Sequence, residues 1–410
     1  MSKMNKNLAR RHRAEKRFRL IGLTAVCASL VFLGILFVTI FHTGSEAFKE
    51  TKVSLEVYLS PDDVAAKDYG GMIKQALRDS FPSVTTRRDK RDLYKLVSSG
   101  AAFELRDQAI RNPSYVGSVI SIWVSASDDV DLLVKGVMRR DAPAAHRRLS
   151  DKQLAWLEML EQSGRVETRF NQTLFTAGDS REPELAGLAG AAIGSLFSVL
   201  VCLVLAFPLG IMTAVYLEEF APRNRWTEFV EININNLAAV PSIVFGLLGL
   251  AVFLGIFHLP RSSPLVGGMV LALMTLPTIV IAGRAAIKAV PPSIREAAFG
   301  LGASQVRTVI DHVVPLAMPG IMTGTIIGTA RALGETAPLL MIGMVAFVVD
   351  LPTSILDPAT ALPVQVFLWA DIPERAFGER TAAAILVLLG FTCLMNLAAI
   401  ILRKKYEIRW

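Results

Sequence analysis

The chain has 410 residues, of which 52% are hydrophobic and only 19% are charged. Soluble domains carry about a quarter charged residues, and here the apolar residues form long runs. The composition excludes an ordinary soluble protein and predicts an integral membrane protein. The formal net charge of +7 does not indicate a nucleic-acid partner. The most basic block directly precedes an apolar run, as a cytoplasmic flank does under the positive-inside rule: Lys3, Lys6, Arg10, Arg11, Arg13, Lys16, Arg17 and Arg19.

The cysteines and histidines show no pattern typical of a metal or redox site. Cys27, Cys202 and Cys393 all lie inside apolar runs, and no CxxC pair occurs. The five histidines are scattered without ligand spacing. We therefore expect no disulfide framework, no metal and no cofactor on this chain. An enzyme is not predicted either, because no nucleophile with a neighbouring base stands out.

The first predicted membrane span covers residues 20–41, and residues 1–19 before it form a basic, cytoplasmic N-terminus. A basic region followed by an apolar run also describes a signal peptide. This run of about 22 residues is longer than the core of a signal peptide, and no small-x-small cleavage site follows it. The pattern favours an uncleaved anchor.

Residues 42–184 are rich in charge and contain no spanning run, which predicts a compact domain outside the membrane. Apolar and polar residues alternate from Val53 to Leu59, which is the period of a strand. Residues 88–110 read as a helix and residues 115–126 as a strand, and Ser150 opens another helix with a capping-box pattern. We expect a small α+β domain that serves as a scaffold or docking surface, because no polar cluster indicates a ligand.

Five more spans are predicted after this outer domain, six in all, so that residues 185–402 form an all-α, polytopic membrane core. Residues 218–236 are predicted to be a polar connection and residues 350–380 an acidic polar loop. Six crossings put the basic ends 1–19 and 403–410 on one side, which the positive-inside rule assigns to the cytoplasm. The five spans are expected at residues 185–217, 237–257, 265–283, within 313–349 and at 381–402.

A polar loop at residues 284–312 connects the fourth and fifth spans on the predicted cytoplasmic side. Pro291 and Pro292 suit the start of a short helix, and Gly302 permits a turn that a Cβ atom would hinder. Ser304 is expected to cap a second short helix over residues 305–311, and Pro315 to interrupt the chain near the membrane. Two short helices at an angle would form a docking surface, although an ordinary amphipathic connector has a similar composition.

The next segment is apolar but carries a charged pair. Gly320, Gly324 and Gly328 repeat every four residues, and on an ideal helix they lie at about 0°, 40° and 80°. Arg331 lies at about 20° and Glu335 at about 60° on the same wheel. Glycines at this spacing let another helix approach closely, so the charged pair is predicted to point into a packed bundle interior.

Two roles fit this charged pair. Arg331 and Glu335 are four residues apart, so they could be a self-contained structural pair. Ionisable residues inside a membrane more often mark a transport pathway. A guanidinium presents forked donors that match the oxygens of phosphate or sulfate. In that interpretation Arg331 meets an anion in transit, and Glu335 positions Arg331 and keeps the anion from binding too tightly.

The polar loop resembles the EAA loop of ABC-importer permeases. The resemblance lies in Glu-Ala-Ala at residues 296–298, in Gly302, and in a segment that closes on Pro315. In that family the loop seats in a groove of the ATPase subunit. The resemblance places the ATPase contact on Glu296, Ala297, Ala298 and Gly302. The sequence departs from the family pattern at His312, where isoleucine is usual, and at Val314, where leucine is usual.

The segment ARALGETAPLL, residues 330–340, resembles the signature of phosphate-importer permeases of the PstA type, and LAAVPSIVFGL and VPPSIREAAFGLGAS fit the same family. The resemblance covers residues 185 to the C-terminus and implies a type I ABC-importer core of about five helices. It assigns phosphate passage to Arg331 and to Arg284. Arg284 also suits a positive-inside anchor at the end of the fourth span. The outer domain resembles an extension seen in one subset of these permeases, and no role transfers to it.

The resemblance implies a permease subunit that imports inorganic phosphate across a bacterial inner membrane. The implied partners are two copies of an ATPase, a second homologous permease and an extracytoplasmic phosphate-binding protein. The chain contains no G-x-x-x-x-G-K-[ST] motif, so ATP hydrolysis is expected on the partner. Two alternatives stay open: a permease for another oxyanion such as sulfate or molybdate, and a membrane-anchored sensor or scaffold subunit.

Overall fold

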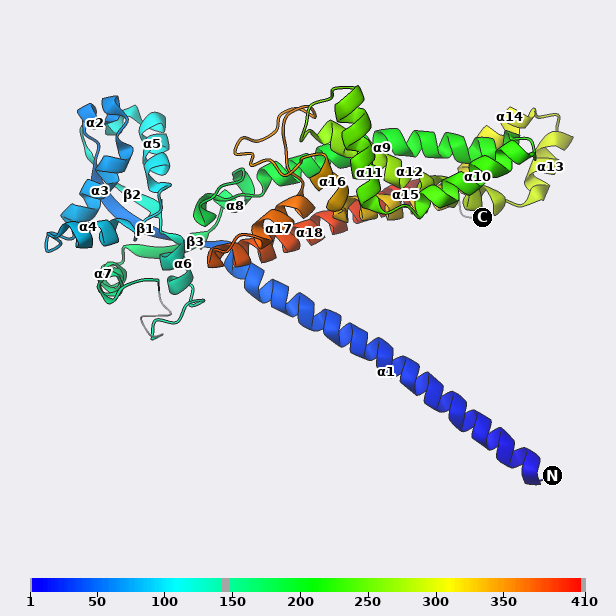
Figure 1. Cartoon of the computed structure of the whole chain (residues 1–410), viewed down its shortest axis with the longest axis horizontal. Coiled ribbons are helices and arrows are strands. Elements are labelled where there is room, and N and C mark those ends of the chain that lie inside the picture. The colour runs from blue at the N-terminus through cyan, green and yellow to red at the C-terminus, as the bar shows by residue number, and fades with distance from the viewer. Residues whose placement is uncertain (1, 142–147, 407–410) are drawn as a thin grey trace.

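The computed structural model describes residues 2–141 and 148–406, and of residues 2–10 and 406 it describes the backbone alone. Figure 1 shows a small domain built on a sheet, a bundle of long helices beside it, and helix α1 (Ser2–Glu46), which leaves from the junction of the two. Within the described residues, five helices are long and apolar enough to cross a membrane, and a bent helix pair is a sixth candidate. The predicted fold class, a helical membrane core with a small α+β domain, is confirmed.

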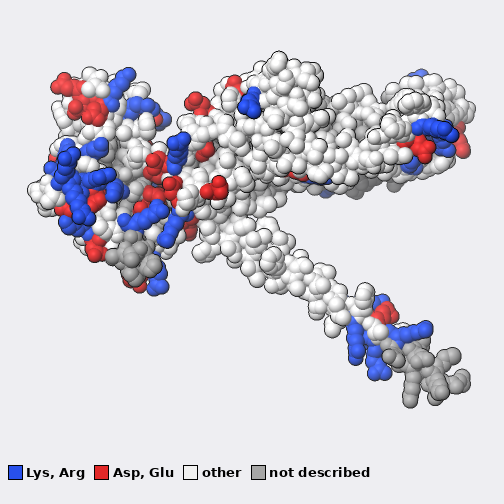
Figure 2. Space-filling model, in the orientation of Figure 1, with Lys and Arg blue, Asp and Glu red and all other residues white. Residues whose placement is uncertain are grey.

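The distribution of charge separates the parts of the molecule (Figure 2). Lysine, arginine and the acidic residues gather on the outer domain, near the N-terminus of α1 and at the far end of the bundle. Between these regions, the visible surface of the bundle and the middle of α1 are nearly free of charge. A surface of this kind matches the hydrocarbon layer of a bilayer, where charged side chains are costly.

Helix α1 contains the predicted basic N-terminus and the predicted first span in one continuous helix. It diverges from the bundle (Figure 1) and touches it near its C-terminal end, where Gly44 lies against Ala382 and Leu386 of α18 (Arg375–Tyr406). A Cβ atom on Gly44 would lie 2.8 Å from the Leu386 side chain. The close approach of the two helices therefore depends on this glycine.

The outer domain is an antiparallel three-stranded sheet in the order β2-β1-β3, with β1 (Lys49–Tyr58) in the centre. The register pairs Leu55 of β1 with Ile122 of β2 (Val119–Ser125) and Val53 with Val166 of β3 (Val166–Phe170). The alternating apolar side chains of β1 are buried, as the sequence predicts. They form one core with the helices of the domain: α2 (Pro61–Ala66), α3 (Tyr69–Ser80), α4 (Arg87–Tyr94), α5 (Ala101–Arg111), α6 (Asp128–Val134) and α7 (Asp151–Gln162).

Two predictions for this domain need correction. The single helix predicted at residues 88–110 is two helices, α4 and α5, because Ser98 and Gly100 turn the chain between them. The strand predicted at 115–126 is shorter, since a 3-10 turn, Pro113–Tyr115, precedes β2. The predicted capping box of α7 is confirmed, with Ser150 and Gln153 each bonded to the backbone of the other.

Buried charges join the outer domain to the membrane bundle. The Lys135 side chain is only 2% exposed, and its Nζ lies 2.5 Å from Asp131 Oδ2 of its own domain and 3.7 Å from Glu379 Oε2 of α18. Arg380 of α18 is also buried and donates to the Ala186 carbonyl at 3.2 Å. Because breaking a buried ion pair leaves an uncompensated charge, these contacts hold the two parts together.

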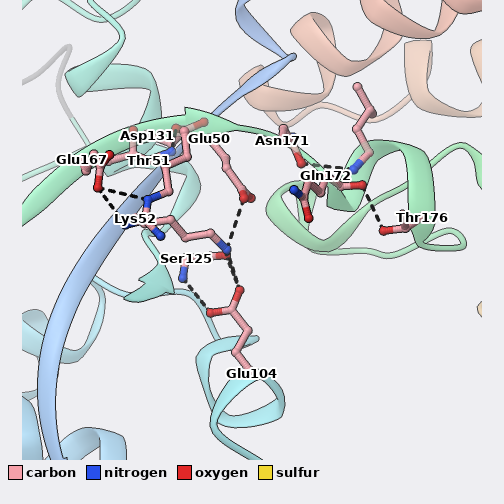
Figure 3. A network of polar contacts seen from close by, with 12 residues as sticks. Glu50, Thr51, Lys52, Glu104, Ser125, Asp131, Glu167, Asn171, Gln172 and Thr176 are labelled. Atoms are coloured by element: carbon pink, nitrogen blue, oxygen red, sulfur yellow. Dashed lines mark hydrogen bonds and ion pairs between the residues drawn. The ribbon is translucent and has the colours of Figure 1, made fainter. Parts of the chain in front are cut away.

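A second polar network lies under β1, close to this junction (Figure 3). Lys52 Nζ bridges Glu104 Oε1 at 2.8 Å and Glu50 Oε1 at 3.3 Å, and it also donates to Ser125 Oγ. Glu50 is 8% exposed, and its Oε2 has no hydrogen-bond partner among the described residues. Burial raises the pKa of the Glu50 carboxyl, while nearby Lys52 opposes that rise.

Glu50→Gln is expected to stabilise the protein at neutral and higher pH. A carboxyl group whose pKa is raised on folding stabilises the native state below its ordinary pKa, and this contribution is lost as the pH rises through the raised value. Glutamine removes the charge, so the melting temperature at pH 8 should rise by about 2–4 °C. Thermal unfolding of the purified chain between acidic and basic pH measures this. The matched control is Glu56→Gln on the same strand, where the side chain is 68% exposed and no change is expected.

The bundle is built around α12 (Pro264–Lys288), which is the most buried of the spanning helices. One side of α12 packs against α9 (Ala189–Val215), where Gly268 lies against Val201. Its other side packs against α15 (Val314–Gly334). Glycine-mediated contacts on both sides of α12 are typical of helices packed in a membrane.

The linker from the outer domain leads into α9 through two short helical turns, α8 (Thr173–Thr176) and η2 (Pro183–Leu185).

The polar connection predicted at 218–236 is wrong for most of its length. After the π-helical turn η3 (Tyr216–Phe220), residues Arg225–Ala238 form helix α10. This helix bends by 102° into a second apolar helix, α11 (Ser242–Gly249) with its π-helical continuation η4 (Leu250–Ile256). Pro241 stands at the bend, where a proline cannot continue the helix. The predicted span 237–257 therefore starts at this bend.

The acidic loop predicted at 350–380 also contains an unpredicted helix, α17 (Leu362–Ala370). It packs against α9 and α18, and Trp369 is 1% exposed while its Nε1 donates to Asp179 Oδ1 at 2.9 Å. Its nine residues are too few for a spanning signal. The last helix, α18, begins at Arg375, before the predicted start of the span at residue 381.

Candidate functional site: a polar loop and a charged helix end

The polar loop between α12 and α15 consists of α13 (Pro292–Gly300), a turn and α14 (Gln305–Thr308). Pro292 occupies the first turn of α13, and Gly302 has a φ of +83°, a conformation that favours glycine. Ser304 caps α14 by accepting from the Arg307 amide at 3.4 Å. Both helical segments lie where the sequence predicts them.

The second segment differs from the prediction because it is not a separate helix. It continues through a π-helical turn, η5 (Val309–Val313), directly into α15. Pro315 was expected to interrupt the chain but lies in the first turn of α15. A proline ring crowds the carbonyl four residues before it, and the wider π-helical turn gives that carbonyl room. A continuous helical backbone therefore joins α14 to α15.

One arginine fixes the loop to the rest of the bundle. Arg295 Nη2 lies 2.6 Å from Glu219 Oε1 of η3 and donates to the Ile287 carbonyl at 3.0 Å. Its Nη1 donates to the Val290 carbonyl at 2.8 Å, and Gln305 Nε2 donates to the Glu219 carbonyl. The loop is thus tied to the ends of both α9 and α12. Our sequence analysis overlooked Glu219, although an acidic pair directly after an apolar span was a usable signal.

The residues predicted to contact an ATPase have different environments. Glu296, Ala297 and Gly302 are exposed, whereas Ala298 is buried at 6% exposure. Ala298 therefore packs within the loop and does not offer a contact surface. The most exposed apolar side chain beside them is Leu301, at 91%. Other large apolar side chains continue this surface: Phe299, Val306 and Ile310.

Gly302→Val is expected to disturb the loop. Valine at a φ of +83° is strained by about 1–3 kcal/mol, although no atom lies within 4 Å of the position where its Cβ would sit. The strain should reshape the turn between α13 and α14. In a reconstituted transport system, the number of solutes moved per ATP hydrolysed should fall several-fold. Gly300→Ala adds a Cβ in equally open space without positive φ and should leave the ratio unchanged.

The three glycines of α15 face α12. A Cβ on Gly320 would lie 2.6 Å from the Cβ of Ala286, and one on Gly324 would collide with Ala282. Gly328 is less crowded, with its nearest neighbour, Thr275, at 3.6 Å. The structure thus brings the first two glycines into close helix–helix contact, and the third into ordinary contact.

Arg331 lies beyond the last of these glycines along α15 and not inside the packed bundle of this chain. Its side chain is 50% exposed, and Ile327, one turn earlier, is also exposed. Glu335 follows the end of α15 and has extended backbone, so the ideal wheel does not describe it. The predicted pairing is present, with Arg331 Nε 3.3 Å from Glu335 Oε1. The predicted burial is wrong within this chain, because the contact with α12 is already looser at Gly328 and Arg331 lies beyond it along α15.

Arg284 has a different environment. Its side chain is 15% exposed, with Nη2 2.7 Å from Glu231 Oε1 and Nε 3.4 Å from Glu218 Oε2. Two carboxylates compensate its charge, which favours the anchor interpretation. Gly320 of α15 contacts Ala286 of α12, and Gly324 contacts Ala282. Arg284, midway between the two alanines, therefore lies at the level of residue 322 on α15. Arg331 is nine residues further, about 13 Å along the axis, so the two arginines lie at different depths.

Comparisons with known proteins identify similar families and structures. Residues 206–407 match the family described as "Binding-protein-dependent transport system inner membrane component", and residues 5–144 match a domain of unknown function, DUF3333. One solved structure with a similar fold is the MetNI methionine ABC transporter in an inward-facing conformation. It is 16% identical with a TM-score of 0.41, over 53% of this chain and 92% of that one.

Several relatives are phosphate transport system permeases. PstA 1 of Mycobacterium tuberculosis (strain ATCC 25618 / H37Rv) is 35% identical over 53% of this chain and 70% of its own length. PstA of Mycobacterium leprae is 34% identical over 56% of this chain and 75% of its own length. PstA of Yersinia pestis is 34% identical over 53% of this chain and 73% of its own length. This chain therefore belongs to the PstA family of inner-membrane permease components of binding-protein-dependent transport systems.

Proposed function

We propose that the chain is the permease subunit of an ATP-driven importer that carries inorganic phosphate across the bacterial inner membrane. Membership of the PstA family supports the substrate, since the relatives are named as phosphate transport permeases. The observation that carries the coupling is the loop of α13 and α14. It presents Leu301 at 91% exposure beside Glu296 and Ala297, and Arg295 ties it to two spanning helices.

The partners in this proposal are two ATPase subunits, a second homologous permease and an extracytoplasmic phosphate-binding protein. An exposed apolar loop tip on a membrane protein is a surface for another protein. The half-exposed Arg331 supports the second permease, because a route for an anion would form where its face meets another chain. ATP hydrolysis lies on the ATPase, and this chain needs no cofactor of its own.

The loop end of the bundle faces the cytoplasm in this proposal, together with the N- and C-terminal ends of the chain. In Figure 1, α18 runs toward the end of the bundle that carries α13 and α14, and the outer domain lies at the opposite end. The basic residues Arg403, Lys404 and Lys405 end α18 on the loop side. The positive-inside rule supports this orientation.

Uptake in proteoliposomes tests the substrate. The chain is reconstituted with its co-purifying subunits and binding protein, and labelled phosphate, sulfate and molybdate are offered in parallel with ATP inside. ATP-dependent entry of phosphate, not competed by the other two anions, is the expected result. Preferred entry of sulfate or molybdate would identify another oxyanion permease. A complex that contains this chain and moves none of them would favour a sensor or scaffold subunit.

A further inference from the structure

A groove runs along the membrane-facing part of the bundle, between α9, α15 and α18. It has a volume of about 510 Å³. Its lining is largely aliphatic and aromatic, and includes Val204 and Phe207 of α9, Met322 and Ile326 of α15, and Ala399 of α18. All three helices are long and apolar enough to span a membrane, so the groove opens where acyl chains are the solvent.

The polar groups on the α15 side of the groove are already used. The Thr325 hydroxyl donates to the Ile321 carbonyl at 3.0 Å, and the Thr329 hydroxyl donates to the Thr325 carbonyl at 2.8 Å. Neither hydroxyl therefore has its proton free for a ligand. Asn396 of α18 adds one amide to the lining, and apart from it the lining fits hydrocarbon and gives a polar solute little to bind.

The groove is separate from the candidate transport face. With Gly320 at 0° on an ideal helix, residues 322, 325, 326 and 329 lie between about 140° and 240°. Arg331 lies at about 20° on the same wheel. The occupant of the groove is therefore on the opposite side of α15 from Arg331.

A cation stands at one end of the groove. Leu402 lines the groove, and the next residue, Arg403, donates from Nη1 to Thr323 Oγ1 at 3.1 Å, beside groove-lining Met322. In the part of the chain that the structure describes, Arg403 forms no ion pair. Lys404 and Lys405 follow it and are exposed. An arginine at the end of a membrane helix, with no ion pair among the described residues, matches the depth of lipid phosphates.

We propose that this groove is a binding site for an anionic phospholipid, with an acyl chain between α9, α15 and α18 and the phosphate at Arg403. The chain's own α1 does not fill the groove, since it diverges from the bundle (Figure 1). The bound lipid would seal α18 against α9 and α15.

Native mass spectrometry tests the site. The purified full-length chain is reconstituted in nanodiscs of phosphatidylcholine with a minority of phosphatidylglycerol, and the lipids that stay bound on release are counted. The wild-type chain should retain phosphatidylglycerol in preference to phosphatidylcholine. Arg403→Gln should lower this preference about fivefold, the effect of one cation near a headgroup. Arg403→Lys should keep most of it, and Ala399→Phe, which fills the groove, should reduce retention of both lipids.

The matched control is Lys405→Gln, an exposed cation on the same helix turn, which should retain lipid like the wild type. Elution volume and melting temperature show that each variant is folded. Equal retention of the two lipids by the wild type would exclude the headgroup contact. Unchanged retention in a folded Ala399→Phe chain would place the lipid elsewhere and overturn the proposal.

Discussion

Arg331→Ala is expected to lower phosphate uptake by at least 100-fold while the amount of assembled complex stays normal. Alanine removes both the positive charge and the forked donors that match a phosphate. The Arg331 side chain is half exposed and, among the residues that the structure describes, is tied only to Glu335, so its loss should cost the fold little. Initial rates of labelled phosphate uptake in proteoliposomes, normalised to the co-purified ATPase, measure the effect.

Two further variants separate a pathway role from a structural pair. Arg331→Lys keeps the charge without the fork, and its uptake should fall about tenfold. Glu335→Gln leaves the guanidinium uncompensated, so phosphate should be held more tightly, with a lower KM and a lower kcat. The control is Arg261→Ala, another exposed arginine of the membrane core, which should transport like the wild type. Wild-type uptake by Arg331→Ala would refute the pathway role.

Arg295→Ala is expected to uncouple ATP hydrolysis from uptake. The substitution removes the ion pair with Glu219 and the bonds to the Ile287 and Val290 carbonyls, so the loop loses its ties to α9 and α12. Glu219, whose side chain is 11% exposed, is left without its partner, at a cost of about 1–3 kcal/mol. The number of phosphate ions moved per ATP hydrolysed should drop at least tenfold. Uptake and ATP hydrolysis measured together in the reconstituted proteoliposomes give this ratio.

The matched control lies in the same loop. Arg307 pairs with Asp311 at 3.4 Å, but its side chain is 78% exposed, so Arg307→Ala should change coupling little. Glu219→Gln should be milder than Arg295→Ala, because Arg295 then keeps its bonds to the Ile287 and Val290 carbonyls. If Arg295→Ala keeps the wild-type ratio, the Arg295–Glu219 pair holds the fold together but does not transmit movement.

The outer domain acquires a physical role from its junction with the bundle. Lys135 is enclosed between Asp131 of the domain and Glu379 of α18, and Arg380 binds the linker at Ala186. These contacts attach the domain to the last span, whose other end carries Arg403. The domain is therefore fixed to α18 by buried charges, which suits the scaffold role that its sequence predicts.

The sequence by itself determined the features that depend on local rules. Long apolar runs must be helical in a bilayer, because backbone groups there can bond only within the chain, and this placed the spanning helices. Proline at the start of α13, glycine at residue 302 and serine at residue 304 act on their own backbone, so they also located the polar loop.

Only the tertiary structure decided which faces are covered and which charges meet. The wheel put Arg331 on the glycine face, but α12 meets that face closely only at Gly320 and Gly324, and Arg331, further along α15, is left exposed. Arg284 and Arg295 find Glu218, Glu231 and Glu219 across 53 to 76 positions of sequence, from helices whose approach no local pattern encodes. Helix packing is a property of two surfaces together, so periodicity in one helix predicts its apolar side but not the partner that meets it.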